Sequence, residues 1–367
     1  RTLEDPRGSI QRTLHSCIKT LDPVREPGKN QTGAIILSLI FLTGSVLLWD
    51  VTHQKISIEE ADSPTSASGS GEWLVWVEES EDGVEITAGN VTSQTNRTVG
   101  GQQWTAAPGV VSSGTSFVIF DNHSADYFEH NQDSGVLEPI FTESFEEEIV
   151  DIAILIDSNG AEHLGILSQN SLQLIDTSDK SIEIVELNTN SSVVASSGAL
   201  IAISEKSESG PLVNITSIDS ELTISIPLDP RSSDRIEDSI INSGTYLDFQ
   251  NSTIVDLVMD SNWLVATVDV GPFNRTVLVD TLSINQTLIS NPRWDSSSPS
   301  IGDGRVAFLQ VTRDDILSSA SSSQRNNDVY VHELESGETK QYTFDEGISQ
   351  TQPQILLERL AWIEIND

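Results

Sequence analysis

Cysteine is nearly absent from this chain, since the single one, Cys17, lies close to the start of the 367 residues. The long region after residue 50 therefore has no intrachain disulfide bond and no thiolate to bind a metal or attack a substrate. A chain of this length has room for one large or two medium domains with a substantial core. We therefore expect burial alone to stabilise the fold.

Lysine is also scarce, and acidic residues dominate. The chain has 56 acidic and 19 basic residues, a net charge of −37. Residues 1–49 hold six basic and four acidic residues, so the remaining 13 basic and 52 acidic residues give the rest of the chain a net charge of −39. This acidity argues against nucleic acid or anionic lipid as a partner of that region. It is typical of a protein that faces salty water, and equally of one kept soluble by its net charge.

Long apolar runs are missing except for one. Residues 33–49 carry no charge over 17 positions, and Trp49 ends the run where an indole favours a membrane interface. A helix of this length nearly covers a hydrocarbon core of roughly 30 Å. A signal peptide is the main alternative, but the 32 preceding residues are long for one and no small-x-small cleavage site follows. A buried globular helix is a further alternative, although it would usually show a polar face. We predict a transmembrane helix.

The charges on either side of this segment predict its orientation. Lys19, Arg25 and Lys29 precede it, whereas Asp50, Glu59 and Glu60 follow it. The positive-inside rule then makes residues 1–32 a cytoplasmic tail and places the bulk of the chain outside the cell. Residues 50–71 are rich in Ser, Gly and Pro and read as a flexible linker, which leaves residues 72–367 as the ectodomain.

The ectodomain reads as all-β, because short apolar runs alternate with turn signals such as Asn159-Gly160 and Ser336-Gly337. The sequence also repeats itself. Pro, Ile, Arg, Ala and an aromatic residue recur in register between residues 299–309 and 353–363, 54 positions apart. A similar strand pattern recurs about every 40 to 60 residues, at residues 73–77, 116–120, 152–156, 199–203 and 263–267. This phase predicts a β-propeller of at least six four-stranded blades, with a β-sandwich as the alternative. Each recurring run suits an inner strand buried on both faces by neighbouring blades.

The last part of the chain resembles the repeat of TolB-like β-propellers, which are common in archaeal and bacterial surface proteins. Residues 327–343 contain Asp328-x-Tyr330, then Gly337-Glu338 and Thr343, and the next pattern begins at Pro353. The resemblance is good over residues 292–367 and partial over 72–290. It implies a propeller whose last blade is incomplete here. Because the chain begins at Arg1 and ends in a strand-like run, we expect it to be a fragment.

Candidate metal ligands are few. His123-x-x-Asp126 with His130 has a spacing that could hold a metal, but the segment reads as an exposed loop and predicts no site. His332 alternates with Tyr330 and is predicted on a solvent face. Asp295, Asp303 and Asp314 are predicted to be solvated charges rather than calcium ligands. We therefore predict no metal site and no cofactor beyond weak binding of divalent cations to the surface.

The visible chain has no nucleophile elbow of the Gly-x-Ser-x-Gly type, and its many carboxylates single out no glycosidase pair. We therefore predict no catalytic residues. Asn-x-Ser/Thr sequons are more frequent than this composition would give by chance, which supports an exported glycoprotein. The candidate acceptors are Asn90, Asn96, Asn122, Asn190, Asn214, Asn251, Asn274 and Asn285.

These observations favour a membrane-anchored surface module that binds a protein or glycan through loops at the ends of a propeller channel. One alternative is the propeller portion of a membrane-anchored serine peptidase, whose catalytic domain would follow residue 367. Another is a structural component of the cell envelope, with an acidic surface that binds divalent cations.

Overall fold

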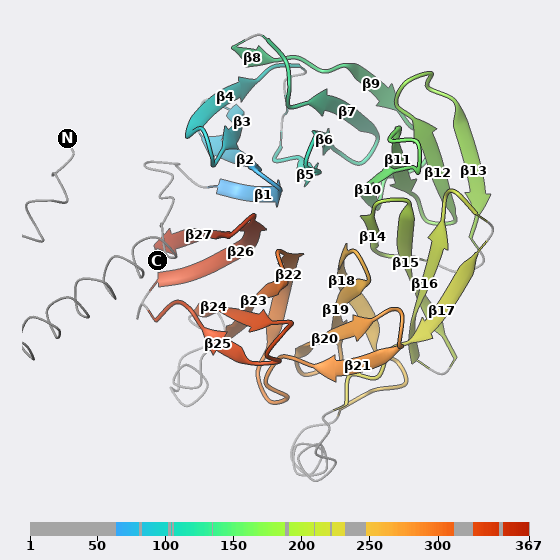
Figure 1. Ribbon diagram of the computed structural model, residues 1–367, viewed down its shortest axis with the longest axis vertical. Coiled ribbons are helices and arrows are strands. Elements are labelled where there is room, and N and C mark those ends of the chain that lie inside the picture. The colour runs from blue at the N-terminus through green and yellow to red at the C-terminus, as the bar shows by residue number, and fades with distance from the viewer. Residues whose placement is uncertain are drawn as a thin grey trace, which may run out of the picture. The chain divides into compact units, whose positions relative to one another are not determined.

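The computed structural model describes residues 64–80, 83–101, 104, 106–133, 135–187, 191–208, 210–220, 222–231, 247–311, 326–344 and 348–366. All of these belong to one compact unit, Lys55–Asp367. Within them every regular element is a β-strand. Seven sheets stand around a central opening, as blades stand around the hub of a propeller (Figure 1).

Each sheet runs outward from the hub in sequence order. The innermost strands are β1 (Pro64–Ser70), β5 (Gly109–Ser112), β10 (Asp151–Ile156), β14 (Val194–Ser197), β18 (Thr253–Asp260), β22 (Ser296–Gly302) and β26 (Ile348–Leu356). The second strands are β2 (Trp73–Ser80), β6 (Ser116–Phe120), β11 (Glu162–Leu167), β15 (Leu200–Ser207), β19 (Trp263–Asp269), β23 (Arg305–Val311) and β27 (Arg359–Asn366). The third strands are β3 (Gly83–Asn90), β7 (Ser124–Glu129), β12 (Ser171–Asp176), β16 (Gly210–Ser217), β20 (Asn274–Asp280) and β24 (Asn327–Glu333). The outermost strands are β4 (Thr95–Val99), β9 (Phe141–Ser144), β13 (Ile182–Glu186), β17 (Thr223–Pro227), β21 (Asn285–Leu288) and β25 (Thr339–Gln341).

Blades 1 to 6 are complete, because each has four antiparallel strands, and blade 1 gains a fifth through the parallel pairing of β4 with β8 (Val136–Leu137). Blade 7 is the two-stranded sheet of β26 and β27. The all-β propeller with at least six four-stranded blades is therefore confirmed.

The second strands explain the recurring apolar pattern. Residues 73–77, 116–119, 201–203 and 264–268 are buried on both faces of their strands, because each blade is covered by a neighbour on either side. Residues 152–156 depart from this scheme. They form the innermost strand β10, so their similarity to the other four runs does not mark an equivalent position.

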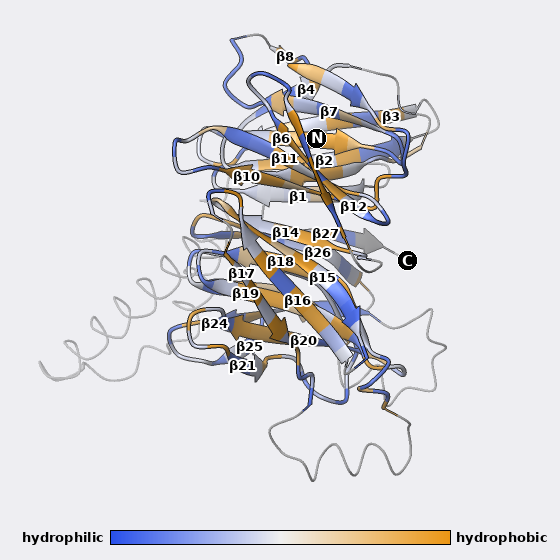
Figure 2. Cartoon of the chain, turned by 90° about the vertical axis from the view of Figure 1, so that its right-hand side faces the viewer, coloured by the Kyte–Doolittle hydropathy of each residue, from blue (hydrophilic) through white to orange (hydrophobic). Residues whose placement is uncertain are grey.

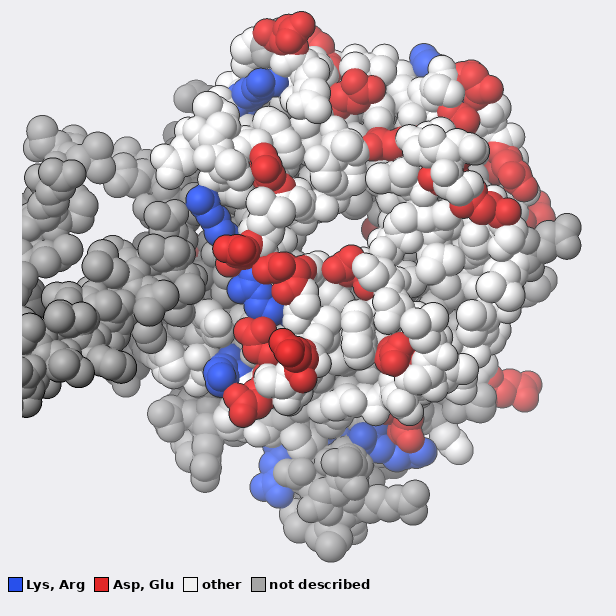
Figure 3. Space-filling view, in the orientation of Figure 1, with Lys and Arg blue, Asp and Glu red and all other residues white. Residues whose placement is uncertain are grey.

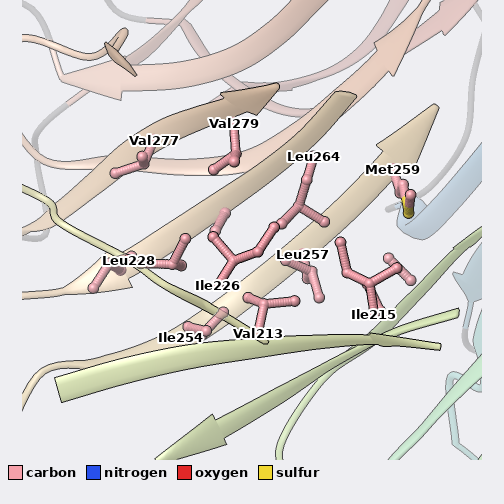
Figure 4. Close-up of a cluster of buried hydrophobic side chains, with 14 of the residues drawn as sticks. Val213, Ile215, Ile226, Leu228, Ile254, Leu257, Met259, Leu264, Val277 and Val279 are labelled. Atoms are coloured by element: carbon pink, nitrogen blue, oxygen red, sulfur yellow. The ribbon is translucent and has the colours of Figure 1, made fainter. Parts of the chain in front are cut away.

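The core is divided among the seven interfaces between adjacent blades, and each interface has its own cluster of buried side chains. The largest, between blades 4 and 5, is built almost wholly from Val, Ile, Leu and Ala (Figure 4). A side view shows the hydrophobic residues along the strands and hydrophilic residues in the connecting loops (Figure 2). Blade 7 has a cluster on each side, so two strands suffice to fill its place in the ring.

The sequence repeat at residues 299–309 and 353–363 corresponds to two equivalent hairpins, β22–β23 and β26–β27. The arginine of the repeat makes an equivalent hydrogen bond in both hairpins. Arg305 of blade 6 donates a hydrogen bond to the Leu357 carbonyl of blade 7 at 3.0 Å, and Arg359 of blade 7 donates to the Val91 carbonyl of blade 1. The repeated arginine therefore ties each blade to the next.

Side chains rather than a shared strand join blade 7 to blade 1. The Gly69 N–H donates to Gln354 Oε1 at 3.0 Å, and the Ala67 N–H donates to Gln352 Oε1. Leu356 and Leu74 belong to the apolar cluster at the same interface. Two glutamine side chains and a small apolar cluster thus close the ring.

The predicted linker, 50–71, extends too far, because its last part forms β1. A run such as Pro-Thr-Ser-Ala-Ser-Gly-Ser looks like a spacer, but small residues fit the crowded hub, where a Cβ on Gly69 would lie 2.5 Å from Leu356 Cδ2. The predicted tail (1–32) and membrane span (33–49) lie outside the described residues. Within the described residues, no helix is long and apolar enough to cross a membrane.

Candidate functional site: the central channel

All seven innermost strands line a channel with a volume of about 850 Å³ along the ring axis. Its walls carry serines on β1, β5, β14 and β22 and two glutamines on β26, interspersed with glycines and with apolar side chains of all seven innermost strands. Among the described residues that line it, none is a lysine or an arginine. Figure 3 shows the opening on one face of the molecule, with Asp and Glu side chains around it. The channel is therefore lined by both polar and apolar groups, and the charged residues among those described are all acidic.

Two aspartates face the channel from non-adjacent blades. Asp151 is the first residue of β10 in blade 3, and Asp256 lies in blade 5 where a β-bulge interrupts the pairing of β18 with β19. A bulge bends its strand and redirects a side chain. Between the two acids lies β14, so residues 105 positions apart in the sequence share one cavity.

Backbone N–H groups hold both carboxylates. Asp151 accepts from its neighbour Ile152 at 2.9 Å and from Val194 of blade 4 at 2.9 Å. Asp256 accepts from Leu257 at 2.9 Å. The Asp151–Val194 bond therefore links two blades as well as orienting the side chain.

Burial raises the pKa of both aspartates. The pKa of Asp151 rises to about 6, although the Val194 and Ile152 N–H groups counteract part of the shift. The pKa of Asp256 rises to about 7, mainly through burial and further through the negative charge of Asp151. Each side chain is partly exposed, but only to the narrow channel, where protein replaces most of the bulk water. Near neutral pH the pair therefore carries less than its full charge of two, and Asp256 is the more readily protonated of the two.

Serine hydroxyls join neighbouring blades around the channel. Ser68 accepts from the Ser112 N–H at 3.0 Å, Ser197 accepts from the Ser261 N–H at 2.7 Å, and Ser300 accepts from the Ile355 N–H at 3.1 Å. These bonds bridge blades 1 and 2, 4 and 5, and 6 and 7. The lining is therefore a rigid support for any ligand that enters.

Tight turns between the first and second strands form one rim of the channel. Five of them are two-residue turns whose first residue has a positive φ, between 48° and 59°: Gly71, Gly198, Ser261, Asp303 and Leu357. Such two-residue turns match the twist of antiparallel strands. Asp260 and Asp303 lie at this rim, so acidic groups occur both inside the channel and at its mouth.

The histidine segment predicted as an exposed loop is instead the buried strand β7 and its end. Asp126 is buried and accepts a hydrogen bond from Thr142 at 2.6 Å, whereas His123 is exposed. The His130 ring is fully buried and stacks on Trp73, with ring centres 4.4 Å apart. The aromatic pair Tyr127-Phe128, of residue types that favour strands, was the available signal for a strand. Among the described residues, no group of three or more His, Cys, Asp or Glu side chains is placed to hold a metal.

His332 does not lie on a solvent face, so that prediction was wrong. It is 4% exposed, and its Nδ1 is 2.9 Å from the Thr339 hydroxyl. Both faces of a third strand are covered by neighbouring blades, so alternation along β24 does not separate buried from exposed residues. Asp295 and Asp303 are exposed as predicted, and Asp314 lies outside the described residues.

The sequon asparagines lie at different depths. Asn96, Asn122, Asn251 and Asn285 are exposed, whereas Asn90, Asn214 and Asn274 are half-buried. Asn190 lies outside the described residues. Asn214 lies within the β16 strand, where its amide donates to Glu205 and its carbonyl accepts from Ser225 at 2.6 Å. The four exposed positions are the most accessible acceptors among those described.

The sequence analysis singled out neither channel aspartate. Each aspartate is the first residue of an apolar run, Asp151-Ile-Ala-Ile-Leu or Asp256-Leu-Val-Met. An acidic residue at the start of such a run was the available signal for a carboxylate in the channel. With 52 acidic residues after residue 49, this signal is too common to identify a pair.

No protein-family profile matches the sequence, and no curated protein matches it. Solved structures do match. The β-propeller domain of the Trilobed protease from Pyrococcus furiosus is 10% identical, with a TM-score of 0.52 over 77% of this chain and 82% of that one. The tricorn protease is 13% identical over 79% of this chain, with a TM-score of 0.41, and this chain spans only 27% of its length. A putative TolB from Agrobacterium tumefaciens is 10% identical, with a TM-score of 0.43 over 70% of this chain and 87% of that one. The fold is a β-propeller. At these identities the similarities establish the fold and not a family.

Proposed function

We propose that this chain is a membrane-anchored interaction module that presents its propeller channel to a protein or glycan ligand at the cell surface. The observation that carries the proposal is the pair Asp151 and Asp256 inside a channel lined by serine and glutamine side chains. Such a cavity favours a ligand with hydroxyl groups or a positive charge, because it offers hydrogen-bond acceptors and two carboxyl groups, and none of the described residues that line it is basic.

The rigid ring supports this role. Propellers present variable loops on a framework that barely moves, so a ligand loses little affinity to reordering of the protein. The apolar run at residues 33–49 and the charge change across it support attachment to a membrane with the ring outside.

Array screening tests the ligand proposal. The full chain is applied to glycan and peptide arrays beside a variant with Asp151→Asn and Asp256→Asn. We expect ligands that bear amines or several hydroxyls, with binding reduced at least about tenfold in the variant. If every ligand found binds both proteins equally well, the channel is not the binding site and the proposal fails.

The anchor has its own test. Cells that express the full chain are extracted with alkaline carbonate, which leaves integral membrane proteins in the pellet. We expect the full chain in the pellet and a chain without residues 33–49 in the supernatant. Recovery of the full chain in the supernatant would reject anchoring.

A second candidate is the propeller portion of a serine peptidase. The similarity to the propeller domain of the Trilobed protease favours it, since that structure has the same fold at a TM-score of 0.52. In that case the product of the complete gene would react with a fluorophosphonate probe and cleave casein. Absence of both activities would reject the peptidase and leave the interaction module as the proposed function.

A further inference from the structure

A second concave surface lies on the outer side of the ring, between blades 3 and 4. It is a groove of about 740 Å³ lined by β12 and β13 on one side and by β15, β16 and β17 on the other. Its floor is apolar and includes Leu174, Leu187 and Ile218, which are half-buried. The groove is separate from the channel, because none of the residues that line it belongs to an innermost strand.

Strand β13 forms one lip of this groove and is exposed at all five positions. It is the last strand of its sheet, so its outer edge has no partner strand among the described residues. Val185 points to the groove and is 39% exposed, while Ile182 and Ile184, on the opposite face, are 49% and 59% exposed. An exposed edge with apolar side chains is a surface on which an extended peptide can add as a further strand.

The charge around the groove is of one sign. Glu183 and Glu186 of β13, Glu205 of β15 and Asp219 all line it, and no described lining residue is a lysine or arginine. Asp219 accepts from the Ser158 N–H at 3.0 Å and Glu205 accepts from Asn214, whereas Glu183 and Glu186 are exposed. A second copy of this acidic chain would be repelled from this edge, but a basic segment would be attracted.

We infer that this groove binds an extended segment of a partner protein that has apolar residues at alternate positions, flanked by lysine or arginine. The segment adds to the free edge of β13, its apolar side chains pack beside Val185 on the groove side, and its flanking basic side chains meet the carboxylates around the groove, Glu186 among them. Alternation follows from the geometry, because side chains of an added strand point to the groove at every second residue. The inference stands apart from ligand binding in the channel.

Fluorescence polarisation tests it with the full chain and three labelled peptides. The first, acetyl-Lys-Val-Thr-Val-Lys-Val-Lys-amide, carries both features. The second replaces lysine by glutamate, and the third replaces valine by serine. We expect saturable binding of the first peptide alone at concentrations up to about 1 mM. Equal binding of the serine peptide would show attraction to the acidic surface without use of the groove and would overturn the inference.

Two substitutions on one strand give a matched comparison. Val185→Lys puts a charge and a longer side chain into the groove, and we expect it to weaken binding at least about tenfold. Ile184→Lys makes the same change on the other face of β13 and should leave affinity within about twofold. Both positions are exposed in the free protein, so both variants should fold. Equal affinity of the two variants would overturn the inference, as would undiminished binding by Val185→Lys, whereas loss of channel binding in the aspartate variants would leave it untouched.

Discussion

The interface between blades 4 and 5 and that between blades 3 and 4 begin alike at the hub and differ at the outer edge. In the first, Ile226 and Leu228 at the outer side of blade 4 are buried against Val277 and Val279 of blade 5 (Figure 4). In the second, β13 of blade 3 faces polar side chains of β16 and β17 in blade 4, and a groove remains between them. The polar side chains are Asn214, Thr216, Thr223 and Ser225. The difference shows that the inner strands hold the ring together and that the outer strands are free to differ.

Truncation of a side chain is the strongest test of this comparison. Ile226→Ala removes a fully buried side chain from the closed interface, and we expect a loss of about 2–5 kcal/mol in the free energy of unfolding. Val185→Ala in the open interface should change it by less than about 0.5 kcal/mol. Urea unfolding of the full chain, followed by tryptophan fluorescence, measures both. Equal losses would mean that the groove is closed in solution.

The aromatic interface between blades 1 and 2 extends the comparison to pH. His130 stacks on Trp73, with ring centres 4.4 Å apart, and its side chain is fully buried. Burial lowers the pKa of His130 to about 4, although the backbone of Ser113 and the charge of Glu162 oppose the shift. The unfolded chain therefore binds a proton below pH 6.5 that the folded chain accepts only near pH 4.

We expect acidification from pH 7 to pH 4 to remove about 3 kcal/mol of stability through this group. The other carboxylates titrate in the same range, so the measurement is the difference between the natural chain and His130→Phe, which keeps an aromatic ring in the stack. Urea midpoints at four pH values give the two slopes. Parallel slopes would exclude His130 as the cause.

A smaller effect tests the inner half of the open interface. A Cβ on Gly165 would lie 2.9 Å from Ile201 Cδ1 and 3.2 Å from Leu155 Cδ1. We expect Gly165→Ala to cost about 1–2 kcal/mol, because the flexible ends of these side chains must shift. Gly114→Ala, where nothing lies within 4 Å, is the control and should be neutral. Thermal unfolding of the two variants compares them, and a neutral Gly165→Ala would mean that this interface is loose along its whole length.

The channel aspartates should give the smallest effect, with the opposite dependence on pH from His130. Because the folded-state pKa of Asp256 is raised, its contribution to stability is full below the unfolded value near 4 and is lost as the pH rises through about 7. The full shift would correspond to about 4 kcal/mol at pH 8, but the carboxylate is half-buried and faces the channel, where solvent screens its charge. We therefore expect Asp256→Asn to be more stable than the natural chain by on the order of 1–2 kcal/mol at pH 8 and to lose this advantage near pH 4. A constant difference between pH 4 and pH 8, measured by urea unfolding, would contradict the raised pKa.

Much of the fold followed from patterns in the sequence. The second strands are buried on both faces, so an unbroken apolar run marked them, and the hairpins repeated at residues 299–309 and 353–363 occupy equivalent places in blades 6 and 7. The turn at Gly160, with φ of 85°, and the turn at Gly337, with φ of 69°, were visible for the same reason, since only local geometry is involved.

The burial of individual polar residues could not be predicted from the sequence. His130 and His332 lie on third strands or at their ends, where the neighbouring blade decides what is covered, and alternation along one strand carries no information about that neighbour. The Ser- and Gly-rich run of β1 was predicted to be part of a linker, but it forms an innermost strand. Small residues suit both a flexible linker and a crowded hub, so composition does not separate the two.

The sequence by itself determined that the chain is acidic, cysteine-poor and built of repeated short strands, because composition and periodicity are local properties. Only the tertiary structure decided that Asp151 and Asp256 share a channel, that glutamines close the ring, and that a groove remains between blades 3 and 4. The physical reason is that a propeller brings together residues separated by whole blades. Contacts across the hub and between blades depend on how the blades pack, which no single strand records.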